Sequence, residues 1–251
     1  MKIFFMLAYS RSRAERPVFT EVIANLREQG LDVTAGVAES AAIDLAQLRV
    51  EADLYVLKSY STLWHNVAAV LDRQGARILN SYGATANTVN KIRAASILSQ
   101  AQMPVPRAWA AGDLFPIGAQ TSLVVKPNVG HGGAGLRVVR EPTEAIEDGM
   151  IVQELIEPIE DEVKLYVIGK QVFGIRKHKE TGVREPVDVD PALADIALRC
   201  GAALGLEICG VDVAISRGQP VVIDVNHFPS FRGIPGIAGP LTDFIASYAR
   251  Q

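Results

Sequence analysis

Short apolar runs and amphipathic stretches alternate along the first third of the chain. Strands are expected at residues 3–8, 31–37, 53–57 and 76–79. Residues 17–29 and 63–73 have helical spacing, and Gly30 ends the first of these helices. Such alternation predicts an α/β domain with a mostly parallel sheet and helices on its faces. The first strand is not followed by a G-x-G-x-x-G dinucleotide fingerprint.

The remainder of the chain combines helices with closely spaced strands. A helix that carries Lys91 is expected at residues 88–100, and the Met-Pro-Val-Pro run at 103–106 ends it and forms a linker. Strands are expected within 123–139 and at 151–156, 163–168 and 171–175. The last two are joined by a turn at Gly169-Lys170. Further helices are expected at 191–204 and 240–250.

Residues 210–226, GVDVAISRGQPVVIDVN, predict a β-hairpin with its turn at residues 217–219. If the turn centres on Gly218, Asp212 lies opposite Asp224, and Asn226 shares the face of Asp224. Buried carboxylates without partners are costly, so two of them beside a carboxamide indicate a cation. Hard oxygen ligands suit Mg²⁺ that bridges phosphates. The alternative, an edge hairpin with solvated Asp side chains, fits the hairpin alone equally well.

Composition sets limits on the classes of function. A chain of 251 residues that is 49% apolar can bury a large core as one large or two small domains. The net charge of −3, without long runs of one sign, argues against a nucleic-acid or membrane-surface partner. The first residues predict a core strand rather than a signal peptide, so a cytoplasmic protein is expected. Cys200 and Cys209 match neither a metal motif nor a disulfide framework.

A glycine-rich loop lies between the two strands expected within 123–139. Its glycines are Gly130, Gly132, Gly133 and Gly135. It is not a P-loop, because no Gly-Lys-Ser/Thr follows, but its backbone N–H groups could hold phosphates beside the charge of Lys126. The alternative is a hairpin whose glycines serve turn geometry. The next apolar strand, residues 151–157, could be an adenine-binding edge or a plain core strand.

The order of these motifs resembles the ATP-grasp superfamily from about residue 87 to the carboxyl end. The resemblance implies an ATP-grasp domain at 87–251 with a mobile lid at about 104–152, preceded by a Rossmann-like, pre-ATP-grasp domain at 1–86. It implies ATP and Mg²⁺ as cofactors. The implied nucleotide contacts are Lys91, Lys126, Gly130, His131, Gly132, Gly133, Gly135, Gln153, Glu154, Leu155, Ile156 and Glu162. The implied metal ligands are Asp212, Asp224 and Asn226, although the second is more often Glu in this superfamily.

Two branches of the superfamily compete. RimK-type carboxylate–amine ligases have a similar glycine-rich loop, and they form an acyl phosphate that an amine attacks. Inositol-trisphosphate 5/6-kinases have a similar lysine at Lys164, and their ending is similar to residues 224–236, with Ser230 as a departure. The sequence favours the kinase as the leading interpretation and keeps the ligase as the alternative. A nucleotide-binding protein without catalysis is the minor alternative.

Basic residues recur where strands are expected to end. Arg11 and Arg13 follow the first strand, Lys58 ends another, and Arg176 follows the strand expected to face the γ-phosphate. With Lys164 and Arg232, they predict a small anionic substrate, phosphorylated or carboxylated, and Arg176 and Lys164 are the candidate catalytic residues. Ordinary solvated surface is the alternative.

Neither a general base nor an oligomeric state is indicated, and a homo-oligomer is compatible with the sequence. The histidines His65, His178 and His227 lack partners at metal-ligand spacing, so hydrogen-bonding or surface roles are expected for them. His227 is expected to point away from the metal. His131 could reach the transferred phosphate from the lid.

Overall fold

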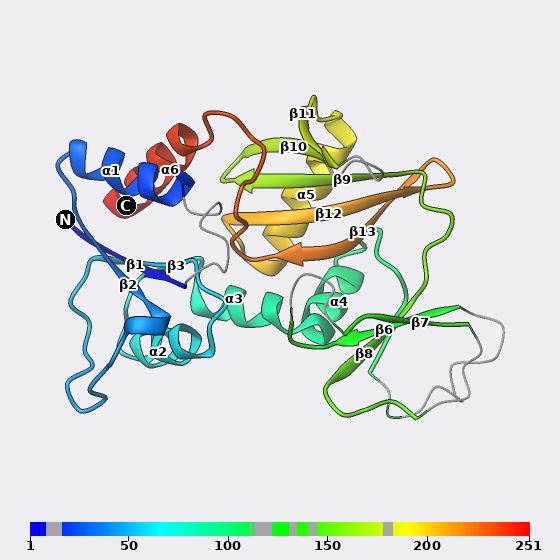
Figure 1. The fold of residues 1–251 in the computed structure, drawn as a ribbon, viewed down its shortest axis with the longest axis horizontal. Helices are drawn as coiled ribbons and strands as arrows, with labels where there is room; N and C mark the ends of the chain where they lie inside the picture. Colours follow the sequence, from blue (N-terminus) through cyan, green and yellow to red (C-terminus); the bar gives the residue numbers. More distant parts are fainter. Residues whose placement is uncertain (9–16, 111, 113–121, 131–134, 141–144, 178–182) are drawn as a thin grey trace.

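The amino-terminal strands form a parallel sheet in the computed structural model, which describes all residues except 9–16, 111, 113–121, 131–134, 141–144 and 178–182 (Figure 1). The strands β1 (Lys2–Leu7), β2 (Asp32–Val37), β3 (Leu54–Leu57) and β4 (Ile78–Leu79) have the order β2-β1-β3-β4. Helices α1 (Pro17–Glu28) and α2 (Thr62–Arg73) connect them. Ser61 caps α2 by accepting a hydrogen bond from the Trp64 amide. The strands and helices predicted for this region are confirmed.

A larger antiparallel sheet forms the centre of the molecule. Its strands are β9 (Asp161–Ile168), β10 (Gln171–Lys177), β11 (Arg184–Val187), β12 (Ile208–Ser216) and β13 (Gln219–Asn226), in the order β11-β10-β9-β12-β13. Helix α5 (Pro191–Leu204) covers one face, where Val163, Leu165, Val211 and Val213 are buried with Cys200 and Leu204 in one apolar cluster. Cys200 and Cys209 are both buried free thiols.

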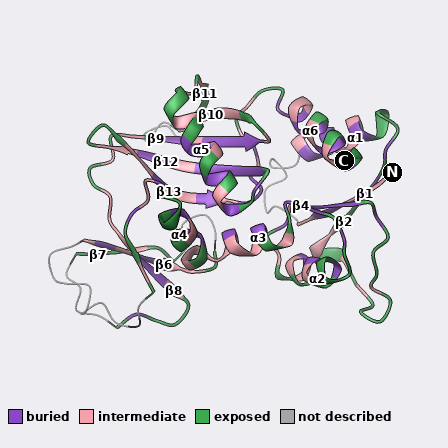
Figure 2. Cartoon of the chain, turned by 180° about the vertical axis from the view of Figure 1, so that it is seen from behind, coloured by how far each residue is buried: buried purple, intermediate pink, exposed green. Residues whose placement is uncertain are grey.

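A small separate sheet projects from the main body (Figure 1). It contains β5 (Ala108–Trp109), β6 (Leu123–Pro127), β7 (Arg137–Val139) and β8 (Met150–Glu154), in the order β5-β8-β6-β7. Its own apolar cluster includes Leu123, Val125 and Val152. The mobile lid predicted at about residues 104–152 includes this sheet and stays a prediction. Figure 2 shows that buried positions are concentrated in the two larger sheets.

The helix predicted at residues 88–100 begins at Lys91 as α4 (Lys91–Gln100), and a separate helix that was not predicted, α3 (Tyr82–Val89), precedes it. Asn90 separates them with an extended backbone, and its side chain caps α4 by accepting from the Arg93 amide. The 3₁₀ helix η2 (Ala38–Ser40) and the strands β5 and β11 were also not predicted. These elements are short, so they present too little periodicity to be recognised.

The amino-terminal and carboxyl-terminal helices pack against each other. The final helix α6 (Ala238–Arg250) packs on α1, and one apolar cluster joins Phe5 and Leu26 with Leu241 and Ile245. The buried side chain of Asn80 adds a polar connection between the two larger sheets. It donates to the carbonyl groups of Ile208 and His227 and accepts from the Glu207 and Ile208 amides. The described helices include none long and apolar enough to cross a membrane.

Candidate functional site

The β12–β13 hairpin contains the predicted acidic residues, but its turn differs from the prediction. Arg217 and Gly218 both have positive φ angles, 51° and 70°, and Ser216 pairs with Gln219, so the loop has two residues rather than three. A regular ladder from this turn would pair Asp212 with Ile223. A β-bulge shifts the register, and Asp212 pairs with Asp224 as predicted.

The bulge also explains which side chains face the cleft. Val222 and Val225 lie three positions apart, yet both are buried in the cluster beneath α5, whereas regular alternation would place them on opposite faces. Ile223 is therefore the extra residue, and Asp224 stays on the face of Asp212. The Asn226 amide nitrogen lies 3.4 Å from Asp212 Oδ2, so the three predicted metal ligands are adjacent.

Lysines from separate elements surround these oxygens. Lys164 Nζ lies 2.6 Å from Asp212 Oδ1, and Lys91 Nζ, at the start of α4, lies 2.6 Å from Asp224 Oδ1. Lys126 Nζ, from the small sheet, donates to the Ile223 carbonyl at 3.4 Å. Burial raises the pKa of Asp212, and Lys164 offsets part of that effect. Burial lowers the pKa of Lys126, and Asp224 opposes this. Three lysines facing two carboxylates suit a polyphosphate.

The donor set suits Mg²⁺ that arrives with phosphates. Asp212, Asp224 and Asn226 provide hard oxygen atoms, which Mg²⁺ prefers. Among the described residues, no three or more His, Cys, Asp or Glu side chains are grouped so that they could hold a metal ion by themselves. Two carboxylates and one amide leave most of an octahedral shell to other ligands, and phosphate oxygens are the ordinary ones. The residues present therefore fit the metal that the resemblance implies.

The face of the small sheet carries Lys126 together with Ile151 and Gln153, by the register of β6 and β8. The Glu154 and Leu155 amides donate to the carbonyl groups of Arg107 and Ser122, and Ile156 is half-buried. Glu162 is exposed on β9, two residues before Lys164 and on the same face. These positions agree with a nucleotide beside Lys126, which stays a prediction.

The glycine-rich loop is described at its two ends. Gly130 follows β6, and Gly135 has a φ of +75°, where a Cβ atom would lie 2.9 Å from Pro127 Cγ. Gly135 is therefore required both by its backbone conformation and by close packing. His131, Gly132 and Gly133 lie outside the described residues, as do Arg11, Arg13 and His178.

The structure corrects the placement of Arg176. Arg176 pairs with Val163 in the register of β10 and β9, so its side chain lies on the α5 face, opposite Lys164 and Asp212. Its Nε donates to Asp161 Oδ2 at 3.0 Å. Arg176 was predicted at the site because it lies near the end of a strand. The alternation of side chains along the strand decides instead which face of the sheet it lies on. Arg176 is therefore not part of the cluster around the carboxylates.

Other basic residues do face Asp212. Arg184 lies on β11 on the face of Ile175, the register partner of Lys164. The Arg232 carbonyl accepts from the Tyr166 hydroxyl at 3.4 Å. Burial raises the pKa of Tyr166 to about 12, Asp212 adds to this, and Arg184 and Arg232 oppose it, so all three charges lie near one phenol. Arg184 and Arg232 thus add positive charge near Tyr166, on the face of the sheet that carries Lys164 and Asp212, and the three basic residues are called the positive wall below.

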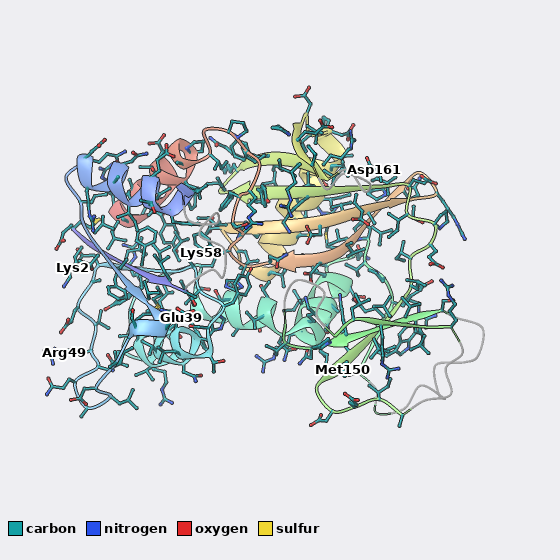
Figure 3. The ribbon with its side chains drawn as sticks, viewed as in Figure 1. Lys2, Glu39, Arg49, Lys58, Met150 and Asp161 are labelled. Atoms are coloured by element: carbon teal, nitrogen blue, oxygen red, sulfur yellow. The ribbon has the colours of Figure 1, made fainter. Side chains whose placement is uncertain are left out.

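Lys58 lies between the amino-terminal and central sheets (Figure 3). Its Nζ is 5.5 Å from the ring centroids of Phe19 and Tyr60 and 6.0 Å from that of Phe228. These are cation–π distances, so the aromatic rings hold the ammonium at the junction of the two sheets. The predicted role in substrate binding is compatible with this position and stays a prediction.

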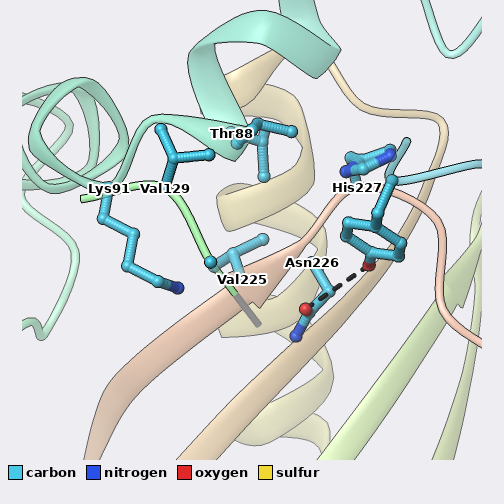
Figure 4. A pocket seen from close by; sticks show the side chains of 9 residues that line it. Thr88, Lys91, Val129, Val225, Asn226 and His227 are labelled. Carbon is cyan, nitrogen blue, oxygen red and sulfur yellow. Dashed lines mark hydrogen bonds between the residues drawn. The ribbon is translucent and has the colours of Figure 1, made fainter. Parts of the chain in front are cut away.

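A pocket of about 60 Å³ lies beside Asn226 (Figure 4). It is lined by Tyr60, Thr88, Val89, Lys91, Val129, Gly130, Val225, Asn226 and His227. The Tyr60 hydroxyl donates to Asn226 Oδ1 at 3.5 Å, and its ring centroid lies 4.5 Å from that of His227. Although 37% of Tyr60 is exposed, burial of its hydroxyl end raises its pKa, and Asp224 and Asp212 raise it further. Tyr60 was not identified from the sequence, because no motif surrounds it.

Comparison with known proteins agrees with this geometry. A model described as the RimK-like ATP-grasp domain matches residues 88–239. A probable alpha-L-glutamate ligase of Xanthomonas campestris pv. campestris (strain 8004) is 26% identical over 196 residues, 67% of each chain. A probable alpha-L-glutamate ligase of Thioalkalivibrio sulfidiphilus (strain HL-EbGR7) is 29% identical over 212 residues, 71% of this chain and 70% of that protein.

Solved structures show the same fold. The RimK domain protein ATP-grasp from Sphaerobacter thermophilus DSM 20745 has a TM-score of 0.75 at 18% identity, covering 97% of this chain and 99% of that one. The ATP-grasp ligase PsnB, solved with a minimal precursor, Mg and ADP, has a TM-score of 0.71 at 20% identity, covering 99% and 98%. The predicted ATP-grasp fold is confirmed.

Proposed function

The chain belongs to the RimK-like ATP-grasp family, and from this premise we propose that it is an ATP-dependent carboxylate–amine ligase acting through an acyl phosphate. The curated relatives described above are named as ligases, which favours this alternative over the kinase that residues 224–236 suggested. The protein is an ATP-dependent enzyme in either case.

The observation that carries the proposal is the row of Asp212, Asp224 and Asn226 with lysines on both sides. Asp212, Asp224 and Asn226 would hold Mg²⁺, which when bound neutralises charge on the transferring phosphates. Lys91 and Lys126 approach from α4 and the small sheet, so they are placed to contact the phosphates. In the nucleotide complex, Lys91 would exchange the Asp224 carboxylate for a phosphate oxygen.

The positive wall of Arg184, Lys164 and Arg232 suits the carboxylate that is activated. Guanidinium and ammonium groups bind and orient a carboxylate before it attacks the γ-phosphorus. The carboxylate oxygen forms the new P–O bond, and the bond to ADP breaks with its electron pair on ADP. The amine then displaces phosphate from the acyl carbon. Positioning and charge neutralisation are the main requirements, so the lack of a predicted general base is tolerable.

An isotope experiment tests the proposal. The protein is incubated with MgATP, hydroxylamine and ¹⁸O-carboxylate-labelled acids, beginning with L-glutamate and a panel of dicarboxylic acids. A ligase transfers one ¹⁸O from the carboxylate to inorganic phosphate and yields a hydroxamate. Transfer of the γ-phosphate to a hydroxyl acceptor in a parallel incubation, as a stable phosphoester without release of inorganic phosphate, would instead establish the kinase. The Asp212→Asn, Asp224→Asn double variant is the control and should lose the transfer.

A further inference from the structure

The start of helix α4 is hydrogen-bonded to the small sheet, beside which it lies (Figure 1). The Lys91 amide donates to the Asn128 carbonyl at 2.9 Å, and the Ile92 amide donates to Asn128 Oδ1, also at 2.9 Å. Asn128 directly follows β6, and its own amide donates to the carbonyl of Gly149, directly before β8, at 2.8 Å. One half-buried residue therefore joins the end of β6 and the start of β8 to the helix that begins with Lys91.

Asn128 completes the capping of α4. The amide groups at the start of an α-helix have no partner within the helix. In α4, Asn90 Oδ1 accepts from the Arg93 amide at 3.0 Å, and Asn128 accepts from the two amides before it. These three amides are therefore already paired. Phosphates near the start of α4 depend on side chains for their binding, and Lys91 is the charged one placed there.

Asn128 also lies between the two lysines that approach β13 from outside the central sheet. Lys126 is two residues before Asn128, and Lys91 is the residue whose amide Asn128 binds. Lys91 Nζ lies 2.6 Å from Asp224 Oδ1. Lys126 Nζ lies 3.4 Å from the carbonyl of the preceding residue, Ile223. A nucleotide that draws both ammonium groups to its phosphates would replace these two contacts, whereas the bonds of Asn128 involve neither ammonium group and can persist.

We propose that Asn128 is a positioning residue, which holds Lys91 and Lys126 at one spacing for the phosphates of a single nucleotide. The inference rests on the nucleotide binding of the proposed function and adds a residue that acts through the two lysines. Charged groups that are already placed lose less conformational freedom on binding, so the nucleotide binds more tightly. Without the Asn128 side chain, part of the binding free energy would be consumed in ordering α4 and the small sheet relative to each other.

Calorimetric titration with Mg²⁺ and the ATP analogue AMPPNP tests the proposal. Asn128→Ala should raise the Kd for AMPPNP by about tenfold, and Asn128→Ser, which keeps a shorter acceptor, should raise it less. Asn90→Ala is the matched control. It also removes one side-chain bond to an α4 amide but keeps the link to the small sheet, so its Kd should stay within about threefold of wild type. Thermal unfolding should show that all three variants fold, with similar losses in the two alanine variants.

An equal rise in Kd in Asn90→Ala and Asn128→Ala would assign the effect to helix capping alone and would overturn the proposal. An unchanged Kd in Asn128→Ala would do the same. If the wild type binds no AMPPNP, the proposed function fails as well. If the wild type binds AMPPNP and Asn128→Ala binds it equally well, the positioning role alone fails.

A double-mutant cycle tests whether Asn128 acts through Lys91. In a Lys91→Met background, Asn128→Ala should raise the Kd for AMPPNP by less than about threefold, because the lysine that it positions is already absent. A further tenfold rise in that background would contradict the proposal.

Steady-state kinetics provide a second separation. Asn128→Ala should raise the KM for ATP and leave the KM for the carboxylate within about twofold. The reason is that the positive wall lies on β9, β11 and the loop after β13 rather than on α4 or the small sheet. An equal rise in both KM values would indicate a general loss of structure and would refute the positioning role.

Discussion

Replacing Lys91 by Met should strengthen divalent-cation binding in the absence of nucleotide and weaken ATP binding. In the structure, Lys91 Nζ lies 2.6 Å from Asp224 Oδ1, and the two side chains are 16% and 31% exposed. A cation that binds Asp224 must first separate this ion pair. The Lys91→Met variant removes the competing charge and keeps a side chain of similar length and apolar character.

The magnitude follows from the strength of the ion pair. A hydrogen bond between charged groups contributes about 1.5–3 kcal/mol, and the partial exposure of both side chains favours the lower value. About 1.4 kcal/mol corresponds to a tenfold change in affinity, so cation binding should tighten by roughly tenfold. ATP should bind at least roughly tenfold more weakly, because its phosphates lose a charged donor.

Mn²⁺ titration followed by electron paramagnetic resonance measures the first effect, and nucleotide calorimetry measures the second. Lys164→Met, which frees Asp212 from an ion pair of the same 2.6 Å length, should likewise tighten Mn²⁺ binding. Lys170→Met, in the exposed turn between β9 and β10, is the matched control and should change neither affinity. Weaker Mn²⁺ binding in Lys91→Met would refute the view that lysines and the metal compete for these carboxylates.

Three further predictions concern single residues. Arg176→Gln should change kcat/KM by no more than about threefold, whereas Arg184→Gln should raise the KM for the carboxylate by about tenfold in steady-state assays, since only Arg184 faces Asp212. Asn80→Ala should lower the free energy of unfolding by about 3–5 kcal/mol in urea titrations, because it leaves buried backbone groups of Glu207, Ile208 and His227 unpaired. Burial lowers the pKa of His227 in the folded protein to about 3, whereas in the unfolded chain it is near 6.5. The unfolded chain therefore binds one more proton between these pH values, and the free energy of unfolding falls as the pH falls. Over that range the wild type should lose about 1 kcal/mol per pH unit relative to His227→Gln, measured by urea titration at each pH.

Patterns that extend over many residues were recoverable from the sequence, because they depend on periodicity. The strands of both larger sheets, apart from β11, and helix α5 have recognisable apolar patterns, and the spacing of Asp212, Asp224 and Asn226 was sufficient to predict a shared cluster. The predicted turn of three residues was wrong, and the pairing held only because the extra residue Ile223 restored the register. A bulge of one residue leaves no periodic signal. The sequence therefore could not distinguish a three-residue turn from a two-residue turn followed by a bulge, since both pair Asp212 with Asp224.

Side chains that depend on contacts distant in sequence were not recoverable. Arg176 and Arg184 are both basic residues near strand ends, and only the register with β9 shows which of them faces Asp212. Asn80 and Tyr60 belong to no motif, and their roles come from carbonyl and amide groups more than a hundred residues away. The face on which a side chain lies therefore decides whether it reaches the site, and its position along the strand does not.

The order of charges across the central sheet gives the proposed reaction a direction. Ile175, Lys164, Asp212 and Asp224 are successive register partners on β10, β9, β12 and β13, so they form one row on the cleft face. On β11 the register partner of Ile175 is Pro186, and Arg184 lies two residues before it on the same face. Lys91 contacts Asp224 at the other end of the row. In the proposed reaction, a triphosphate held by Lys91 and Lys126 would therefore reach Asp212 and Asp224 from one side, and a carboxylate held by Arg184 and Lys164 would reach them from the other. The γ-phosphate would move along the row from β13 toward β9.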